Sequence, residues 1–371
     1  MFFKDIIGQE KIKERLIKGV LTDRVSHAQL FLGENGTGGL PLALAYAQYV
    51  NCENRGETDS CGVCHACRKT MALEHPDLHF TYPVIPKKSG DKPVSTDYIV
   101  EWRKALRENV YLDYADWMGK LNAENKQGNI TAEECRDIFK KLSLTPVYEG
   151  FKIIIIWMPE FLSKEGNRLL KLIEEPPPKT LFLLVAENEE LILTTILSRT
   201  QISYIPKIES QTLRTAIMER FEVGGEEADR ITFLASGNFR TAMRVYEAGE
   251  NDYTKQFVDW MRLCYALNGP GLLKWVDEIA GAGRENQKNF LLYGLGLFRE
   301  CLLNGYQLNQ ISRVMESEKA FVGNFSKFIS ERNIYQLVNA LNTNHYHIER
   351  NAHPKILFFN LSLQISELLR A

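Results

Sequence analysis

The chain has 371 residues, of which 44% are apolar and 25% are charged, so it is long enough for two or three domains with cores of their own. Its 45 Lys and Arg residues are balanced by 47 Asp and Glu residues, which leaves a formal net charge of −2. This balance excludes an overall field that would attract nucleic acid or an anionic membrane. The sequence shows no signal peptide and no apolar run of membrane-spanning length, so we expect a cytoplasmic protein without membrane contact.

The first elements of the chain are a predicted helix, a strand, a glycine-rich loop and a second helix. Apolar residues recur at helical spacing over residues 9–21, and residues 27–32 predict a short buried strand that ends at Gly33. After the loop, residues 41–50 predict a helix with proline in its first turn, where the missing N–H costs little. A strand that leads through a glycine-rich turn into a helix is the arrangement of phosphate-binding loops.

Further strands are predicted at residues 78–83, 152–158, 180–186 and 201–205. The runs KIIII and LFLLV are apolar at almost every position, which is typical of a parallel sheet covered by helices on both faces. Residues 1–206 are therefore predicted to form an α/β domain with a five-stranded parallel sheet.

Residues 83–129 interrupt this pattern and are interpreted as an insertion, because they are rich in Lys, Gly, Asn and Asp and contain no strong strand. Their aromatic and basic residues allow two interpretations: a stacking surface for single-stranded nucleic acid, or side chains that pack the insertion against the domain, which we favour. The aromatic and basic residues of the insertion are Tyr98, Trp102, Arg103, Lys104, Tyr111 and Trp117.

Regular structure resumes after the insertion at Thr131. Thr131 and Glu134 have the spacing of a capping box.

Beyond Pro206 the chain shows helical periodicity and no strand of comparable strength. The turn-forming residues at 249–252 and at 268–270 are the best breaks in this part. We therefore predict a small helical domain at residues 207–250 and a C-terminal helical domain at residues 251–371.

The glycine-rich loop lacks the side chains that handle the charge of a nucleotide. In the motif G-x-x-x-x-G-K-[ST], lysine reaches the terminal phosphates and the hydroxyl holds magnesium. Here the loop glycines Gly33, Gly36 and Gly38 are present, but Gly39 stands at the lysine position and Leu40 at the hydroxyl position. The loop is therefore a degenerate phosphate loop, or else a glycine-rich turn whose spacing arose by chance.

The second half of an ATP site would be an acidic pair at the end of the strand that begins at Lys152. Trp157 and Met158 stand there instead, and neither can bind magnesium or act as a base. Two independent elements are thus lost together. We expect the chain neither to hydrolyse ATP nor to hold it.

Four of the seven cysteines lie within sixteen residues: Cys52, Cys61, Cys64 and Cys67. The pattern C-x8-C-x2-C-x2-C supplies four thiolates, enough for a closed tetrahedral zinc site that fastens a small module at residues 52–67. His65 is a conceivable substitute ligand, and an iron–sulfur cluster is the chemical alternative. A site with four protein ligands has no open position for catalysis.

Several stretches in this order resemble the AAA+ clamp-loader family of bacterial DNA polymerase III, which includes delta-prime and gamma/tau subunits. They are DIIGQEKI (5–12), HAQLFLGENGTGG (27–39), the four cysteines, NRLLKLIEEPPP (167–178) and ILSRT (196–200). The loss of the lysine and of the acidic pair points to the non-hydrolysing delta-prime type. The resemblance implies that residues 207–250 are a lid and residues 251–371 are a collar that mediates oligomerisation.

The resemblance also implies roles for two arginines. In the family's Ser-Arg-Cys motif the arginine reaches a neighbour's ATP as an arginine finger, and here Ser198 and Arg199 match it, with Thr200 in place of cysteine. The plainer interpretation makes Arg199 a surface salt-bridge partner. Arg240 stands at the second-sensor position, where without a nucleotide it would be structural.

The function implied by the resemblance is that of a subunit in a hetero-oligomeric ring with gamma/tau and delta subunits. The ring loads the sliding clamp onto primed DNA as part of the DNA polymerase III holoenzyme, a DNA-directed DNA polymerase. Two alternatives stay open. One is a gamma/tau-like ATPase that tolerates the changed loop, and the other is a zinc-dependent DNA-binding repair protein with salt-sensitive DNA affinity of its own.

Overall fold

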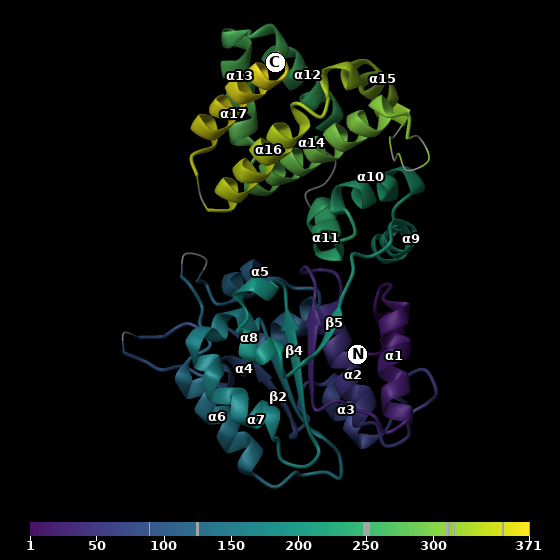
Figure 1. Cartoon of the computed structure of the whole chain (residues 1–371), viewed down its shortest axis with the longest axis vertical. Coiled ribbons are helices and arrows are strands. Elements are labelled where there is room, and N and C mark those ends of the chain that lie inside the picture. Colours follow the sequence, from purple (N-terminus) through teal and green to yellow (C-terminus); the bar gives the residue numbers. More distant parts are fainter. Residues whose placement is uncertain are drawn as a thin grey trace. The chain divides into compact units, whose positions relative to one another are not determined.

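The computed structural model of the chain describes residues 1–88, 90–123, 126–247, 253–308, 310, 312, 314, 316–350 and 352–370. The chain divides into two compact units (Figure 1). The first contains residues 1–213 together with residues 237–240, and the second contains residues 214–236 and 241–371. The three-domain division proposed from the sequence stays a prediction, and its boundary at residue 250 lies outside the described residues.

A five-stranded parallel sheet forms the centre of the first unit, which confirms the predicted α/β class. Its strands follow the order β2-β3-β4-β1-β5, and each neighbouring pair is parallel. Since the carboxyl ends of parallel strands meet at one edge, the residues that follow β1, β3 and β4 lie near one another. The strands are β1 (Ala28–Leu32), β2 (Leu78–Thr81), β3 (Lys152–Trp157), β4 (Thr180–Ala186) and β5 (Gln201–Tyr204).

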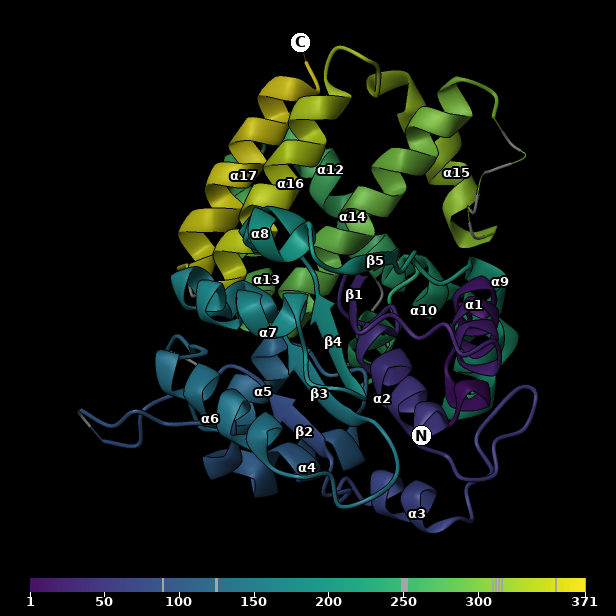
Figure 2. The ribbon, with the colours of Figure 1, turned by 60° about the horizontal axis from the view of Figure 1, so that its bottom comes forward.

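Helices cover both faces of this sheet. Ile153 and Ile155 pack in one apolar cluster with α2 (Gly39–Val50), while Ile154 and Ile156 pack in another with α6 (Ala132–Ser143) and α7 (Leu170–Glu174). Figure 2 shows α2 on one side of the sheet and α6 and α7 on the other. Burial on both faces explains why the run KIIII does not alternate. The unit also contains η1 (Phe3–Asp5), α1 (Glu10–Leu21), α3 (His65–Met71), η3 (Pro159–Leu169), η4 (Glu189–Leu191) and α8 (Thr194–Leu197).

The insertion packs against this domain through its aromatic residues. Trp102 and Trp117 are both 0% exposed and meet edge to face, with ring centroids 5.1 Å apart. Tyr98 and Tyr111 are also buried. The favoured interpretation is therefore confirmed, because buried rings cannot stack on a nucleic acid. The described part of the insertion contains η2 (Ser95–Tyr98), α4 (Ile99–Glu108) and α5 (Tyr114–Lys120), while residues 89, 124 and 125 lie outside it.

The start of α6 forms only half of the predicted capping box. The Thr131 hydroxyl accepts the backbone N–H of Glu134 at 3.4 Å, as predicted. The Glu134 carboxylate instead accepts the backbone N–H of Ser95 at 2.5 Å and the hydroxyl of Thr81 at 2.8 Å. Burial raises the pKa of this carboxyl group. The prediction was wrong for Glu134 because the insertion supplies competing donors that no local spacing reveals.

The second unit is built from helices in its described residues. Trp260 stacks on Trp275 with ring centroids 4.8 Å apart, and its indole N–H donates to the Ser362 hydroxyl at 2.8 Å. These contacts join three helices in one core. The helices are α10 (Gly225–Ala235), α12 (Tyr253–Ala266), α13 (Gly269–Gly281), α14 (Arg284–Gly305), α15 (Glu316–Phe325), η6 (Ser326–Phe328), α16 (Ile334–Glu349) and α17 (Pro354–Leu368), with most of α9 (Ser210–Phe221) and α11 (Phe239–Glu247).

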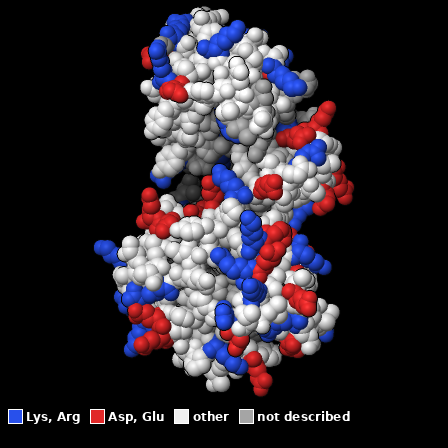
Figure 3. Space-filling model, turned by 45° about the vertical axis from the view of Figure 1, so that its right-hand side comes forward, with Lys and Arg blue, Asp and Glu red and all other residues white. Residues whose placement is uncertain are grey.

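The molecular surface carries charges of both signs. Basic and acidic side chains are interspersed on the face shown in Figure 3. Neither sign forms a continuous field over that face, in keeping with the net charge of −2. Among the described residues, the helices are all too short or too polar to span a bilayer.

Candidate functional site

The glycine-rich loop connects β1 to α2 at the carboxyl edge of the sheet. Gly36 and Gly38 have φ angles of +69° and +110°, a region that residues with a side chain rarely adopt. Gly39 and Leu40 lie in the first turn of α2, and Leu40 is buried. The strand, loop and helix predicted from the sequence are present, and the first turn of the helix offers neither an ammonium nor a hydroxyl group at these two positions.

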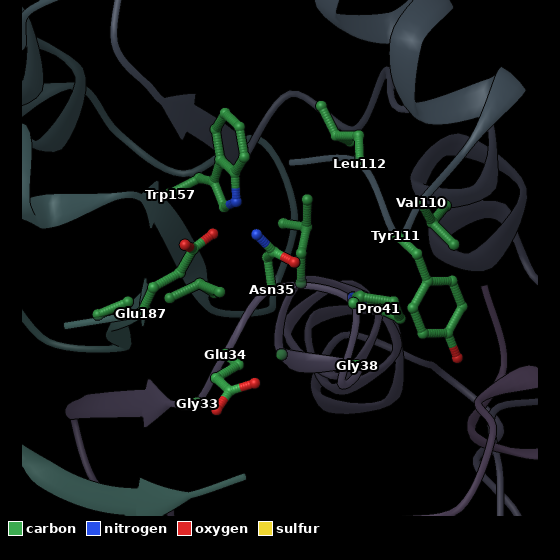
Figure 4. A pocket seen from close by; sticks show the side chains of 15 residues that line it. Gly33, Glu34, Asn35, Gly38, Pro41, Val110, Tyr111, Leu112, Trp157 and Glu187 are labelled. Atoms are coloured by element: carbon green, nitrogen blue, oxygen red, sulfur yellow. The ribbon is translucent and has the colours of Figure 1, made fainter. Parts of the chain in front are cut away.

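The space above this loop is narrow. The cavity there has a volume of about 20 Å³, which is room for about one water molecule. Trp157 from the end of β3 and Glu187 from the end of β4 border it, as Figure 4 shows. Its remaining walls include Gly33 and Asn35 of the loop and Val110, Tyr111 and Leu112 of the insertion.

The charged residues that line this cavity are Glu34 and Glu187. Glu187 accepts a hydrogen bond from the side chain of Asn35. Burial, followed by repulsion from Glu160 and Asp113, raises the pKa of Glu187 from 4.5 to about 8. Near neutral pH Glu187 is therefore mostly protonated, and the cavity lining offers no cation at a position where a working site presents lysine and magnesium.

The short turn at residues 237–240 folds back onto the loop. The side-chain amide of Asn238 donates to the backbone oxygen of Asn35 at 2.7 Å. The backbone N–H of Phe239 donates to the oxygen of Gly36 at 3.0 Å. A Cβ atom at Gly36 would lie 2.0 Å from Oδ1 of Asn238, so glycine is required for this approach. The loop is thus closed from above by residues about 200 positions later in the chain, counted from the separation of 203 between the two asparagines.

Arg240, at the predicted second-sensor position, pairs with a carboxylate of its own chain. Its Nε and Nη2 atoms donate to Oδ2 and Oδ1 of Asp116, both at 2.6 Å. The two side chains are only 12% and 19% exposed. Two short parallel bonds make this a bidentate pair, the strongest arrangement of arginine and carboxylate. The guanidinium is therefore engaged by the insertion.

Arg199 follows α8 and is anchored at the surface of the first unit. Its Nη2 lies 2.6 Å from Oε1 of Glu174, and its Nη1 donates to the oxygen of Thr195 at 2.9 Å and to the hydroxyl of Ser198 at 3.2 Å. The side chain is 31% exposed. The ion pair agrees with the plainer interpretation of Arg199, and its action on a neighbour's ATP stays a prediction.

The four cysteines form one cluster beside α3. Their sulfur atoms all lie within 4.8 Å of one another, and those of Cys61 and Cys67 are 3.9 Å apart. Sulfurs bound to a tetrahedral zinc at about 2.3 Å are about 3.8 Å from each other, so the observed spacing fits a metal ion. Cys52, Cys64 and Cys67 are buried. The cluster is therefore positioned to bind a metal.

Backbone donors support the negative charge that four thiolates would carry. The N–H of Cys61 points to the sulfur of Cys52 at 3.2 Å, and the N–H of Cys67 points to the sulfur of Cys64 at 3.4 Å. Such donors orient metal ligands from outside the first shell of atoms. His65 is exposed, and its ring lies 5.3 Å from that of Tyr148. The metal-binding group found in the described residues consists of the four cysteines without His65.

Two residues in or near the cavity above the loop, Glu187 and Asp116, were not predicted from the sequence. Glu187 belongs to a run of acidic and polar residues typical of an exposed loop, yet it directly follows a fully buried strand whose carboxyl end lies beside the loop. Its position after that strand was the available signal. Asp116 lies 124 positions before Arg240, and nothing in the local pattern links the two.

Comparison with known proteins places this architecture in a family. The family model described as "DNA polymerase III, delta subunit" matches residues 8–209. That range is more than half of the 371 residues, so the chain belongs to this DNA polymerase III delta-subunit family of clamp-loader proteins. The fold and the four-cysteine cluster agree with that class.

Curated relatives carry the names of tau and gamma subunits. The DNA polymerase III subunit tau of Bacillus subtilis (strain 168) is 25% identical over 385 residues, which cover 96% of this chain and 60% of the relative. The subunit gamma of Buchnera aphidicola subsp. Acyrthosiphon pisum (strain APS) is 27% identical over 256 residues, covering 67% of this chain and 59% of the relative. The chain thus spans 60% or less of these two relatives.

A solved structure gives a weaker match. It is that of a DNA polymerase III gamma subunit-related protein from Thermotoga maritima, with 16% identity and a TM-score of 0.40, covering 98% of this chain and 100% of that one. At this score the overlay supports no conclusion about the arrangement of the parts.

Proposed function

We propose that this chain is a delta-prime-like subunit of a DNA polymerase III clamp loader. In this role it does not hydrolyse ATP itself, and it presents Arg199 to ATP held by a neighbouring subunit. Its partners would be gamma/tau and delta subunits, and the assembled ring would place the sliding clamp on primed DNA. Membership of the family supports the setting. The observation that carries the non-hydrolysing role is the cavity of about 20 Å³ above the loop.

The surroundings of Arg199 suit a group that acts on a partner's phosphate. Thr195 and Ser198 hold one side of the guanidinium, which restricts its motion before a ligand arrives. The other side pairs with Glu174, which is 47% exposed. An ion pair exposed to this extent contributes only about 0–1 kcal/mol. Exchange of Glu174 for a phosphate oxygen therefore costs little, whereas the gain in stabilising a developing phosphate charge is large.

The decisive experiment compares ATP turnover of the reconstituted ring containing wild-type chain or Arg199→Ala, with clamp and primed DNA present. We expect at least a tenfold loss at the neighbouring site, because an arginine finger contributes roughly 10³–10⁵ in rate. Arg168→Ala is the matched control, since Arg168 also forms an exposed ion pair, with Glu165. Size-exclusion chromatography must show equal assembly for all three chains. Unchanged turnover by an intact Arg199→Ala ring would reject the finger.

We also propose that the four-cysteine cluster holds zinc in a structural role. Complete ligation by Cys52, Cys61, Cys64 and Cys67 leaves no position for a substrate, so the metal would fasten the module between α2 and α3. Metal analysis of the purified chain should give about one zinc per chain. Iron with visible absorption would instead identify an iron–sulfur cluster.

A gamma/tau-like ATPase is the second candidate, since the Bacillus subtilis relative named tau aligns with 96% of this chain. Equilibrium binding of a fluorescent ATP analogue to the isolated chain separates the two candidates. Saturable micromolar binding would favour the ATPase. An ordinary ATP-binding protein is measured beside the wild-type chain as a positive control. Absence of saturation up to millimolar analogue would support the delta-prime-like role.

A further inference from the structure

The residues that fill the nucleotide-type cavity from above come from the insertion, and their chemistry resembles that of a ligand. Tyr111 is 2% exposed, and its hydroxyl accepts the backbone N–H of Ile7 at 3.0 Å. Its ring meets the ring of Phe239 edge to face, with centroids 5.0 Å apart. A Cβ built at Gly38 would lie 3.9 Å from the same ring. An aromatic ring is thus wedged between the N-terminal segment, the loop and the turn at residues 237–240.

The insertion also contributes a carboxylate, that of Asp116, which binds the turn at residues 237–240. Asp116 gives both of its oxygens to Arg240 at 2.6 Å. Its position is fixed from within the insertion, because its backbone N–H donates to Asp113 at 2.8 Å and its carboxylate accepts the backbone N–H of Asp113 at 3.0 Å. Two carboxylate oxygens offer an arginine the same planar pair of acceptors that a phosphate offers.

We propose that residues 110–116 are an internal ligand, a built-in replacement for nucleotide. The Tyr111 ring and the Asp116 carboxylate are the aromatic and the anionic group of this ligand, and together they hold the turn at residues 237–240 against the loop. The proposal rests on the interpretation of the loop as a former nucleotide site, which the proposed function shares, but it is independent of Arg199. It assigns a role to the insertion and makes the position of the turn independent of ATP.

The hold of Asp116 on the turn can be measured at the hydrogen bond between Phe239 and Gly36. The N–H of Phe239 donates to Gly36, so its exchange with deuterium reports how often the turn leaves the loop. Loss of the charge on Asp116 leaves a mostly buried guanidinium without its anion, which favours the open state. We therefore expect Asp116→Asn to speed amide exchange of residues 237–240 by about tenfold or more.

Asp97→Asn is the matched control. Asp97 stands at the start of η2 as Asp116 stands at the start of α5, and its carboxylate accepts the backbone N–H of Val94 at 3.0 Å. Asp97 is exposed and forms no arginine pair within the described residues. The substitution removes a similar local hydrogen bond and should leave the exchange of residues 237–240 unchanged.

The experiment is hydrogen–deuterium exchange of the full chain, read by mass spectrometry for peptides that cover residues 237–240 and β3. Exchange of β3 shows whether each variant is folded. Faster exchange of the turn in Asp116→Asn, with β3 and Asp97→Asn unchanged, supports the proposal. Unchanged exchange of the turn in a folded Asp116→Asn chain overturns it.

A second arm uses the wild-type chain alone and so does not depend on the folding of a variant. Millimolar magnesium ATP should leave exchange of the loop and the turn unchanged, because the internal ligand occupies the site. Protection of the loop or the turn by ATP overturns the proposal. Neither arm requires partner subunits, so a failed arginine finger and a failed internal ligand give different results.

Discussion

Replacement of Glu187 by glutamine should stabilise the protein, and increasingly so as the pH rises. The pKa of this carboxyl group is raised from 4.5 to about 8, chiefly by burial and then by Glu160 and Asp113. Between these values the native state holds a proton that the unfolded chain has released, so the stability of the wild type falls as the pH rises from 4.5 to 8. At 1.36 kcal/mol per pH unit, the whole interval corresponds to at most about 5 kcal/mol.

Glutamine resembles the protonated acid and removes this pH-dependent loss. The gain of Glu187→Gln over wild type should be close to zero near pH 4.5, grow through neutral pH and level off above pH 8. Since 1 kcal/mol shifts Tm by about 2–4 °C in a domain of this size, the maximum of about 5 kcal/mol corresponds to a difference in Tm of about 10–20 °C. The assay is thermal unfolding by circular dichroism from pH 5 to pH 9.

Glu190→Gln is the matched control, because Glu190 lies in the same stretch but is exposed. It removes the same charge from solvent and should leave the pH dependence of Tm unchanged. A difference between Glu187→Gln and wild type that stays constant from pH 5 to pH 9 would show that the carboxyl group is not held in its protonated form. Glu187 would then not be a buried, protonated carboxyl group beside the loop.

Three further predictions concern the metal cluster, the loop and α6. Cys64→Ser should reduce bound zinc to well below one per chain and lower Tm, whereas Cys135→Ser, at a buried cysteine outside the cluster, should leave the zinc content unchanged in metal analysis. In urea unfolding, Gly36→Ala should lower the free energy of unfolding by at least about 2 kcal/mol more than Gly90→Ala does. Both glycines have positive φ, but of the two only Gly36 lies against another side chain. Thr131→Ala should lower the free energy of unfolding by about 1 kcal/mol in the same assay, because the N-cap of α6 is lost. A change smaller than about 0.3 kcal/mol, roughly the error of such comparisons, would contradict the cap.

The sheet and the metal cluster were predictable because their signals are local. A fully apolar run such as residues 153–156 has few alternatives to a strand buried on both faces. Four cysteines at short spacing are close in space wherever the chain goes. The same holds for the degenerate loop, whose missing lysine is evident at Gly39. Each of these features needs only residues near in sequence, or a composition that few folds can accommodate.

The contacts that close the cavity were not predictable, because each depends on a partner far along the chain. Asp116 has the spacing of a local helix cap and makes that cap, yet it also binds Arg240 from 124 positions away. Glu134 has a capping-box spacing, but its carboxylate accepts the backbone N–H of Ser95 instead. Short-range patterns describe what a side chain can do locally, while tertiary packing decides which of several partners it binds.

The strand order of the first unit makes β1 wait during synthesis for the strands with which it pairs. β1 is made first but pairs with β4 and β5, which come much later. Asn35 must wait for Asn238 across 203 positions, which at about 5–20 residues per second takes about 10–40 s of translation. Until β4 and β5 have been made, the nascent chain carries an apolar strand with both edges unpaired, the kind of segment that chaperones bind.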